Sequence, residues 1–94
     1  MVSGDYEWDK AKAEANLAKH GIGFDEAAAA LDSDPDELAA PDPIDSSRTH
    51  SIVMSLRRHV LLVVTTEAGA RTRIISARKA EPHEQHTYDQ EKRV

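Results

Sequence analysis

The chain has 94 residues, of which 39% are hydrophobic, 31% charged and 4% aromatic, and its formal net charge is −5 at pH 7. This length predicts one domain over residues 1–94 with a thin core that a partner would help to stabilise. Cysteine is absent, which excludes disulfides and thiolate metal sites. No apolar run approaches the roughly 20 residues that span a bilayer, and the acidic N-terminus is unlike a signal peptide. We therefore expect a soluble cytoplasmic protein.

Charge is distributed unevenly along the chain. Residues 20–45 contain eight acidic residues and no Lys or Arg, whereas residues 48–79 contain seven basic residues and one acid. The two stretches are either ordinary solvated surface or the two sides of a bipolar protein whose basic face suits a polyanion. On the second interpretation, the basic stretch meets RNA or an acidic partner and the acidic stretch faces away.

Periodicity, turn residues and helix caps predict both helices and strands. Asp9 and Gly21 are suitable caps for a helix with Ala13 and Leu17 on its apolar stripe. In chain order we expect a leading strand at 6–8, helices at 10–20 and 24–31, a loop at 32–45 with an edge strand near Leu38, strands at 51–56, 60–64 and 71–77, and a helix from Pro82 to roughly Lys92. This order predicts an α+β fold with a short N-terminal strand, a two-helix hairpin, an antiparallel meander of three to four strands and a C-terminal helix.

Arginines gather on the predicted strands. Arg48 and His50 share a face with the apolar residues of the strand at 51–56, which indicates an end that opens to solvent or to a ligand. On the strand at 71–77, simple alternation puts Thr72, Ile74, Ser76 and Arg78 on one face and Arg71, Arg73, Ile75 and Ala77 on the other. These arginines either pair with the acidic loop or form a cluster that holds phosphates bidentately.

The histidines form no familiar metal pattern. His83 and His86 are three residues apart, whereas the HExxH zinc pattern needs four, and this favours a solvated helix face. His59 is expected at the surface, His20 ends a helix, and the role of His50 stays open. The sequence also has no Gly-rich phosphate loop, nucleophile elbow or dinucleotide fingerprint. We expect no metal site and no cofactor.

Two sequence blocks resemble one family. The segment YEWDKAKAEANLAKHGIGFDEA at 6–27 is similar to the opening of the BrnT family of toxins, and TTEAGARTRIISARKA at 65–80, followed by Glu84 and Tyr88, is similar to that family's ending. The resemblance implies a RelE-like fold and a metal-independent ribonuclease that inhibits translation as the toxin of a type II toxin–antitoxin system. It also implies a BrnA-like antitoxin with a ribbon-helix-helix domain, in a complex of two toxins and two antitoxins that contacts DNA only through the antitoxin.

The same resemblance suggests which residues act on RNA. Cleavage needs a base for the 2′-OH proton, cations for the phosphorane and an acid for the leaving 5′-oxygen. Arg48 and Arg78 would supply the cations, His20 or Glu84 would act as base or acid, and Tyr88 would stack on a base or donate a proton. The further residues expected to bind RNA are Lys19, Arg57, Arg58, Ser76 and Lys79. Asn16 is expected to hold the helical hairpin, and Arg73 to anchor a salt bridge if helices cover its face.

The chain departs from the family's pattern at three places. Ser47-Arg48 stands where Glu-Arg is usual, Arg57-Arg58 where Gly-Arg is usual, and Glu84-Gln85-His86 where Glu-Arg-Arg is usual. The last helix therefore lacks one or two cations, and His86 would replace one only when it is protonated at low pH. The alternative to an active ribonuclease is a degenerate homologue that binds the antitoxin and regulates the operon without cutting RNA.

Overall fold

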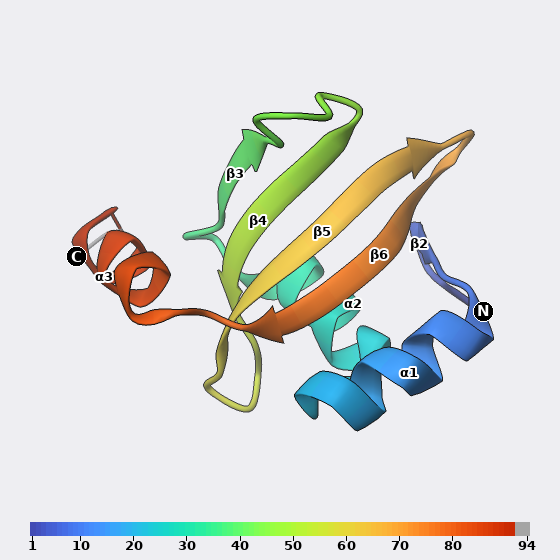
Figure 1. The fold of residues 1–94 in the computed structure, drawn as a ribbon, viewed down its shortest axis with the longest axis horizontal. Helices are drawn as coiled ribbons and strands as arrows, with labels where there is room; N and C mark the ends of the chain where they lie inside the picture. Colours follow the sequence, from blue (N-terminus) through green and yellow to red (C-terminus); the bar gives the residue numbers. More distant parts are fainter. Residues whose placement is uncertain (92–94) are drawn as a thin grey trace.

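In the computed structural model, which describes residues 1–91, a sheet of six strands has two helices packed on one face and a third helix beyond the end of β6 (Figure 1). The strands lie in the order β1 (Val2–Ser3), β2 (Tyr6–Glu7), β6 (Arg71–Lys79), β5 (Val60–Ala68), β4 (Arg48–Met54) and β3 (Leu38–Pro41). The helices are α1 (Lys10–His20), α2 (Phe24–Ser33) and α3 (Pro82–Glu91). Neighbouring strands are antiparallel except for the parallel pair β2 and β6. The predicted α+β class is confirmed, with β1 as an additional strand.

The caps of α1 act as their residue types predict. The carboxylate of Asp9 accepts a hydrogen bond of 3.0 Å from the backbone N–H of Lys12, and Gly21 adopts a left-handed φ of +73°. The helix bounds therefore match the prediction. The predicted apolar stripe is wrong at Leu17, which is 52% exposed, because the residue that α1 turns towards the sheet is Asn16.

Asn16 joins three parts of the fold. Its Nδ2 donates to the carbonyl oxygen of Ile22 at 3.0 Å and to that of Ala77 at 2.7 Å, and its Oδ1 accepts from the N–H of Ala77 at 3.2 Å. Because β2 pairs with β6 only at Thr72 and Arg73, the edge of β6 has no neighbouring strand at Ala77. The Asn16 amide takes the place of a peptide group from that missing strand. This confirms the expectation that Asn16 holds the hairpin.

The core lies between the two helices and the covered face of the sheet. Trp8 and Phe24 meet edge to face, with ring centroids 6.2 Å apart. The other members of this cluster are Ile22, Ala27, Ala28, Ala30, Val53, Leu61, Val63, Ile74 and Ala77. Many of these are alanines, so the core is thin, as the composition predicts.

A bulge in β6 changes which side chains share a face. Val64 pairs with Ser76, but the next residue, Thr65, pairs with Ile74, so Ile75 is an extra residue in β6. The predicted alternation therefore holds on each side of the bulge and is wrong across it. The face covered by α1 and α2 receives Thr72, Ile74 and Ala77, whereas Arg73, Ser76 and Arg78 point to the opposite face. The bulge thus brings arginines that simple alternation separates onto one surface.

Several element bounds differ from the predictions. Helix α2 continues to Ser33, two residues beyond the expected end, β4 runs from Arg48 to Met54, and β5 extends to Ala68. The turn at 57–58 and the edge strand near Leu38 are confirmed. The predicted end of the last helix at Lys92 lies outside the described residues. Within residues 1–91, no helix is long and apolar enough to cross a membrane.

Candidate active site

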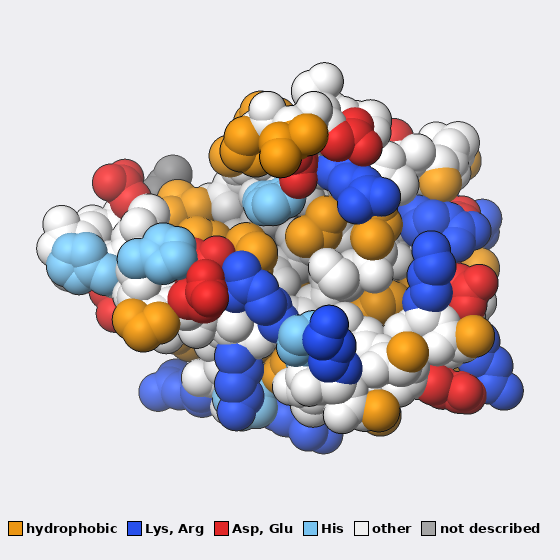
Figure 2. Space-filling model, viewed as in Figure 1, with side chains coloured by type: hydrophobic (Ala, Val, Ile, Leu, Met, Phe, Trp, Pro, Cys, Tyr) orange, Lys and Arg blue, Asp and Glu red, His pale blue; other side chains and the backbone are white. Residues whose placement is uncertain are grey.

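The face of the sheet opposite α1 and α2, called the open face below, carries the arginines. The strand register arranges its side chains in rows: Arg48, Thr66 and Arg73; then His50, Val64 and Ser76; then Ile52, Leu62 and Arg78; then Met54 and Val60. Figure 2 shows this side of the molecule, with hydrophobic side chains near its centre and Lys and Arg side chains around them. Arg48 and Arg73 therefore share the row at one end of this face, and Arg78 lies two rows away, beside the apolar side chains of β4 and β5.

Arg78 forms a bidentate ion pair with Glu84 at the start of α3. Its Nη1 and Nη2 lie 2.8 and 3.0 Å from the two carboxylate oxygens of Glu84, and Nη1 also donates to the carbonyl of Lys79. Glu84 additionally accepts from the N–H of Glu81, as a residue in the first turn of a helix commonly does. The hydrogen bonds from Arg78 hold the pKa of Glu84 below its usual value, with a smaller contribution from Glu81. Glu84 is therefore a carboxylate whose contacts position Arg78.

Arg48 and Arg73 are the more accessible cations of the open face. Arg48 lies 3.6 Å from the carboxylate of Asp45, and both side chains are about half exposed. Arg73 forms a 2.8 Å ion pair with Glu7 across the β2–β6 pair. Exposed pairs of this kind are weak and exchange readily with another anion. Among Arg48, Arg73 and Arg78, only Arg48 pairs with the acidic stretch.

Tyr88 is an anchor for α3. It is 2% exposed, and its hydroxyl donates at 2.8 Å to Oδ2 of Asp34, which also accepts from the N–H of Met54 at 2.8 Å. Burial, followed by the hydrogen bond and negative charge of Asp34, raises the pKa of Tyr88 above its usual value. The structure thus commits the Tyr88 hydroxyl to a contact inside the protein. The expectation that the acidic stretch faces away from the basic one is wrong for Asp45, which pairs with Arg48, and for Asp34, which contacts Tyr88 and the backbone of Met54.

The structure separates the other predicted residues. His20 is half-buried at the end of α1, one turn beyond Asn16 and on the same side of the helix, whereas Lys19 is exposed. Ser76 is on the open face. Arg57 lines a hollow with Asp25 and Glu26 of α2, whereas Arg58 and Lys79 line another hollow of about 230 Å³ with Gln85 of α3. The sheet therefore gathers Arg48, Ser76 and Arg78 on one surface and leaves Arg57 at its end, against α2.

The sequence did not reveal the partner of His50. Its Nε2 lies 2.7 Å from Oδ2 of Asp42, eight residues earlier. Asp42 also accepts backbone hydrogen bonds from Asp45 and Ile44, and these, with a smaller contribution from His50, lower its pKa to about 2. The sequence predicts a loop over residues 32–45, but nothing in it indicates that the segment Asp-Pro-Ile-Asp folds back onto β4.

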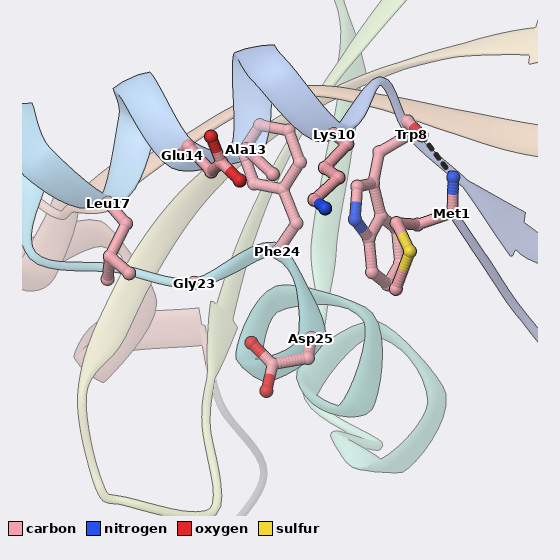
Figure 3. A pocket seen from close by; sticks show the side chains of 9 residues that line it. All are labelled: Met1, Trp8, Lys10, Ala13, Glu14, Leu17, Gly23, Phe24 and Asp25. Atoms are coloured by element: carbon pink, nitrogen blue, oxygen red, sulfur yellow. Dashed lines mark hydrogen bonds between the residues drawn. The ribbon is translucent and has the colours of Figure 1, made fainter.

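Two other groupings lie outside the open face. Carboxylate and imidazole atoms of Glu81, His83 and Glu84 lie within 4.8 Å of one another, but Glu84 is already engaged by Arg78. An apolar hollow of about 300 Å³ lies between α1 and the start of α2, with Trp8 and Phe24 in its wall (Figure 3). The walls of this hollow are mainly apolar, and its charged side chains are Lys10, Glu14 and Asp25.

Fold and surface together define a small α+β protein with one helix-covered sheet face and one open sheet face that carries three arginines, each paired with a carboxylate. The family model described as "Ribonuclease toxin, BrnT, of type II toxin-antitoxin system" matches residues 8–84. The chain belongs to this family, which confirms the resemblance seen in the sequence. It is therefore a type II toxin, and such a toxin has an antitoxin partner.

Solved structures agree with this assignment. The chain is similar to the Brucella abortus ribonuclease toxin BrnT, with 25% sequence identity and a TM-score of 0.65 over 79% of this chain and 92% of that one. A search of curated proteins gives no match.

Proposed function

We propose that the chain is a metal-independent endoribonuclease that inhibits translation by cutting RNA on the open face. The observation that carries this proposal is the placement of Arg48, Arg73 and Arg78 on one face of the sheet, which the bulge in β6 makes possible. An arginine can donate two parallel hydrogen bonds to a phosphate, and its charge stabilises a developing phosphorane without a metal ion.

The structure narrows the roles within this proposal. Of the two groups expected to act as acid or base, Glu84 is held by Arg78. We therefore assign the acid role, protonation of the leaving 5′-oxygen, to His20, which lies one turn beyond Asn16, where α1 meets the edge of β6 at the residue before Arg78. Glu84 and Tyr88 are positioning residues, since the first orients Arg78 and the second fixes the helix that carries Glu84. Lys19, Ser76, Arg58 and Lys79 would contact the RNA on either side of the reacting phosphate.

Partner and location follow from the same proposal. The antitoxin is a BrnA-like protein with a ribbon-helix-helix domain, and two copies of each chain form the complex, which contacts DNA only through the antitoxin. The toxin acts in the cytoplasm, where its RNA substrate is. The antitoxin would inhibit by covering the open face and pairing its own acidic groups with Arg48 and Arg73.

Cleavage of a defined RNA by the purified chain in the presence of a metal chelator tests this function. Arg78→Ala should lower the cleavage rate by about 10²–10³, the usual effect of removing one group that stabilises a transition-state charge. Arg78→Lys keeps the charge and should retain part of the rate. The control Lys10→Ala, on the exposed side of α1, should cleave like the wild type. Cleavage that depends on a divalent metal, or an unchanged rate for Arg78→Ala, would contradict the proposal.

One observation supports a second candidate, a non-catalytic module. Both terminal nitrogens of Arg78 already donate hydrogen bonds to Glu84. Gln85 and His86 supply no permanent cation on α3. Such a module would bind the antitoxin and help to regulate the operon without harming the cell. Growth arrest when the chain is expressed alone, with rescue by the antitoxin, supports the ribonuclease. Unhindered growth together with tight antitoxin binding supports the module.

A further inference from the structure

His50 and Asp42 form a hydrogen-bonded pair on the open face. The distance between Nε2 of His50 and Oδ2 of Asp42 is 2.7 Å, and about a third of the His50 side chain is exposed. The carboxylate of Asp42 also accepts hydrogen bonds from the backbone N–H groups of Ile44 and Asp45, at 2.8 and 2.9 Å, and these bonds orient it towards His50. The pair therefore combines a carboxylate held by two backbone hydrogen bonds with an imidazole that solvent can reach.

The position of His50 in the sheet places it between the arginines. In the strand register, its row lies between the row of Arg48 and Arg73 and the row of Arg78. Rows on one face of a strand are about 7 Å apart and neighbouring strands about 5 Å, so the backbone of His50 lies about 7 Å from that of Arg48 and about 12 Å from that of Arg78. A phosphate held between the arginines would lie next to this histidine.

The low pKa of Asp42 decides which ring nitrogen is free. A carboxylate with a pKa of about 2 is ionised at neutral pH and can only accept hydrogen bonds, so Nε2 of His50 carries the proton that Asp42 binds. Nδ1 then has its lone pair available, and it has no hydrogen-bond partner among residues 1–91. A histidine oriented by a carboxylate in this way is the arrangement of a general base.

We propose that His50, oriented by Asp42, is the general base of the RNA cleavage described under the proposed function, on which this role rests. Nδ1 of His50 takes the proton from a ribose 2′-OH, and the 2′-oxygen forms a bond to the neighbouring phosphorus. The bond from phosphorus to the 5′-oxygen breaks, and that oxygen leaves with a proton from His20. The products are an RNA fragment ending in a 2′,3′-cyclic phosphate and a fragment with a free 5′-OH. Asp42 is a positioning residue that also stabilises the imidazolium formed on His50.

The chain contains a matched control for this pair. His59 and Glu26 form a second histidine–carboxylate contact, with Nδ1 3.0 Å from Oε2, and it joins the loop after β4 to α2. The two pairs have similar contacts and similar exposure of the histidine, but only His50 lies on the open face. A structural role predicts the same outcome for both histidines, whereas a catalytic role predicts a different one.

The experiment measures single-turnover cleavage of a defined RNA by the full-length chain, together with binding of the same RNA carrying 2′-O-methyl groups, which cannot be cleaved. His50→Ala should lower the cleavage rate by about 10²–10⁴ and change binding less than threefold. Added imidazole should restore part of the rate, because a free base can occupy the vacated space. Asp42→Asn should lower the rate with little change in binding, and His59→Ala should leave both unchanged.

The possible results separate this inference from the function on which it rests. If the wild type cleaves RNA and His50→Ala cleaves equally fast, His50 is not the base, while the ribonuclease proposal stands. If His50→Ala is inactive, melts at a lower temperature than His59→Ala and is not rescued by imidazole, the pair is a structural contact of the loop and the inference is overturned. If the wild type cleaves no RNA, the proposed function itself fails, and the role of His50 fails with it.

Discussion

Replacing Asn16 by Ala tests how much one buried amide contributes to this fold. The substitution removes three hydrogen bonds, two that Nδ2 donates to the carbonyls of Ile22 and Ala77 and one that Oδ1 accepts from the N–H of Ala77. At about 1 kcal/mol for each, the free energy of unfolding should fall by about 3 kcal/mol. Domains of this size are stable by roughly 5–14 kcal/mol in total, so the loss is a large share.

Thermal and urea unfolding followed by circular dichroism measure this effect. A loss of about 3 kcal/mol corresponds to a fall in melting temperature of roughly 12–24 °C for a domain near 100 residues. The control Glu14→Ala, at an exposed position of α1, should change stability by less than about 0.5 kcal/mol. Asn16→Asp should be at least as harmful as Asn16→Ala at neutral pH, because a carboxylate cannot donate to the two carbonyls. A loss below about 1 kcal/mol for Asn16→Ala would refute the idea that this amide replaces a missing strand.

Two further substitutions test local features. Arg58 has a left-handed φ of +68°, so Arg58→Gly should raise the free energy of unfolding by about 0.5–1 kcal/mol in urea titration, whereas Arg57→Gly, where the backbone is not left-handed, should lower it. Tyr88→Phe should lower stability by about 1.5 kcal/mol at pH 7, because it removes the hydrogen bond to the Asp34 side chain. The pKa of Tyr88 is raised in the folded protein, so the contribution of its hydroxyl to the free energy of unfolding is complete below pH 10 and is lost at higher pH. The wild type should therefore lose more stability between pH 9 and 11 than Tyr88→Phe. An equal alkaline loss in both proteins would contradict the role given to this hydroxyl.

The sequence predicted helices and strands well where a residue type favours one particular backbone position, such as a helix cap. Asp9 and Gly21 bound α1 because a short carboxylate satisfies free N–H groups and glycine accepts a left-handed backbone. The run at 60–64 became the central part of β5 because its side chains are apolar on both faces. Leu17 failed as a core residue because amphipathic spacing cannot show which part of a narrow stripe meets the sheet.

The candidate site was predictable only in part. Arg48 and Arg78 could be proposed from the resemblance to the family, and the structure places both on the open face. The engagement of Glu84 by Arg78 and the burial of Tyr88 depend on where α3 docks, which is a contact between distant parts of the chain. Sequence patterns do not encode such docking.

By itself, the sequence determined the family, the order of helices and strands, and the separation of acidic from basic stretches, because each of these depends on neighbouring residues. The tertiary structure decided which charges meet. The bulge at Ile75 places Arg73 on the same face as Arg78, and the turn after β3 brings Asp42 to His50. Both depend on the pairing of one strand with another, in which a shift of one residue moves a side chain to the opposite face of the sheet. The net charge of −5 therefore conceals an open face whose cations and histidine are arranged by strand register.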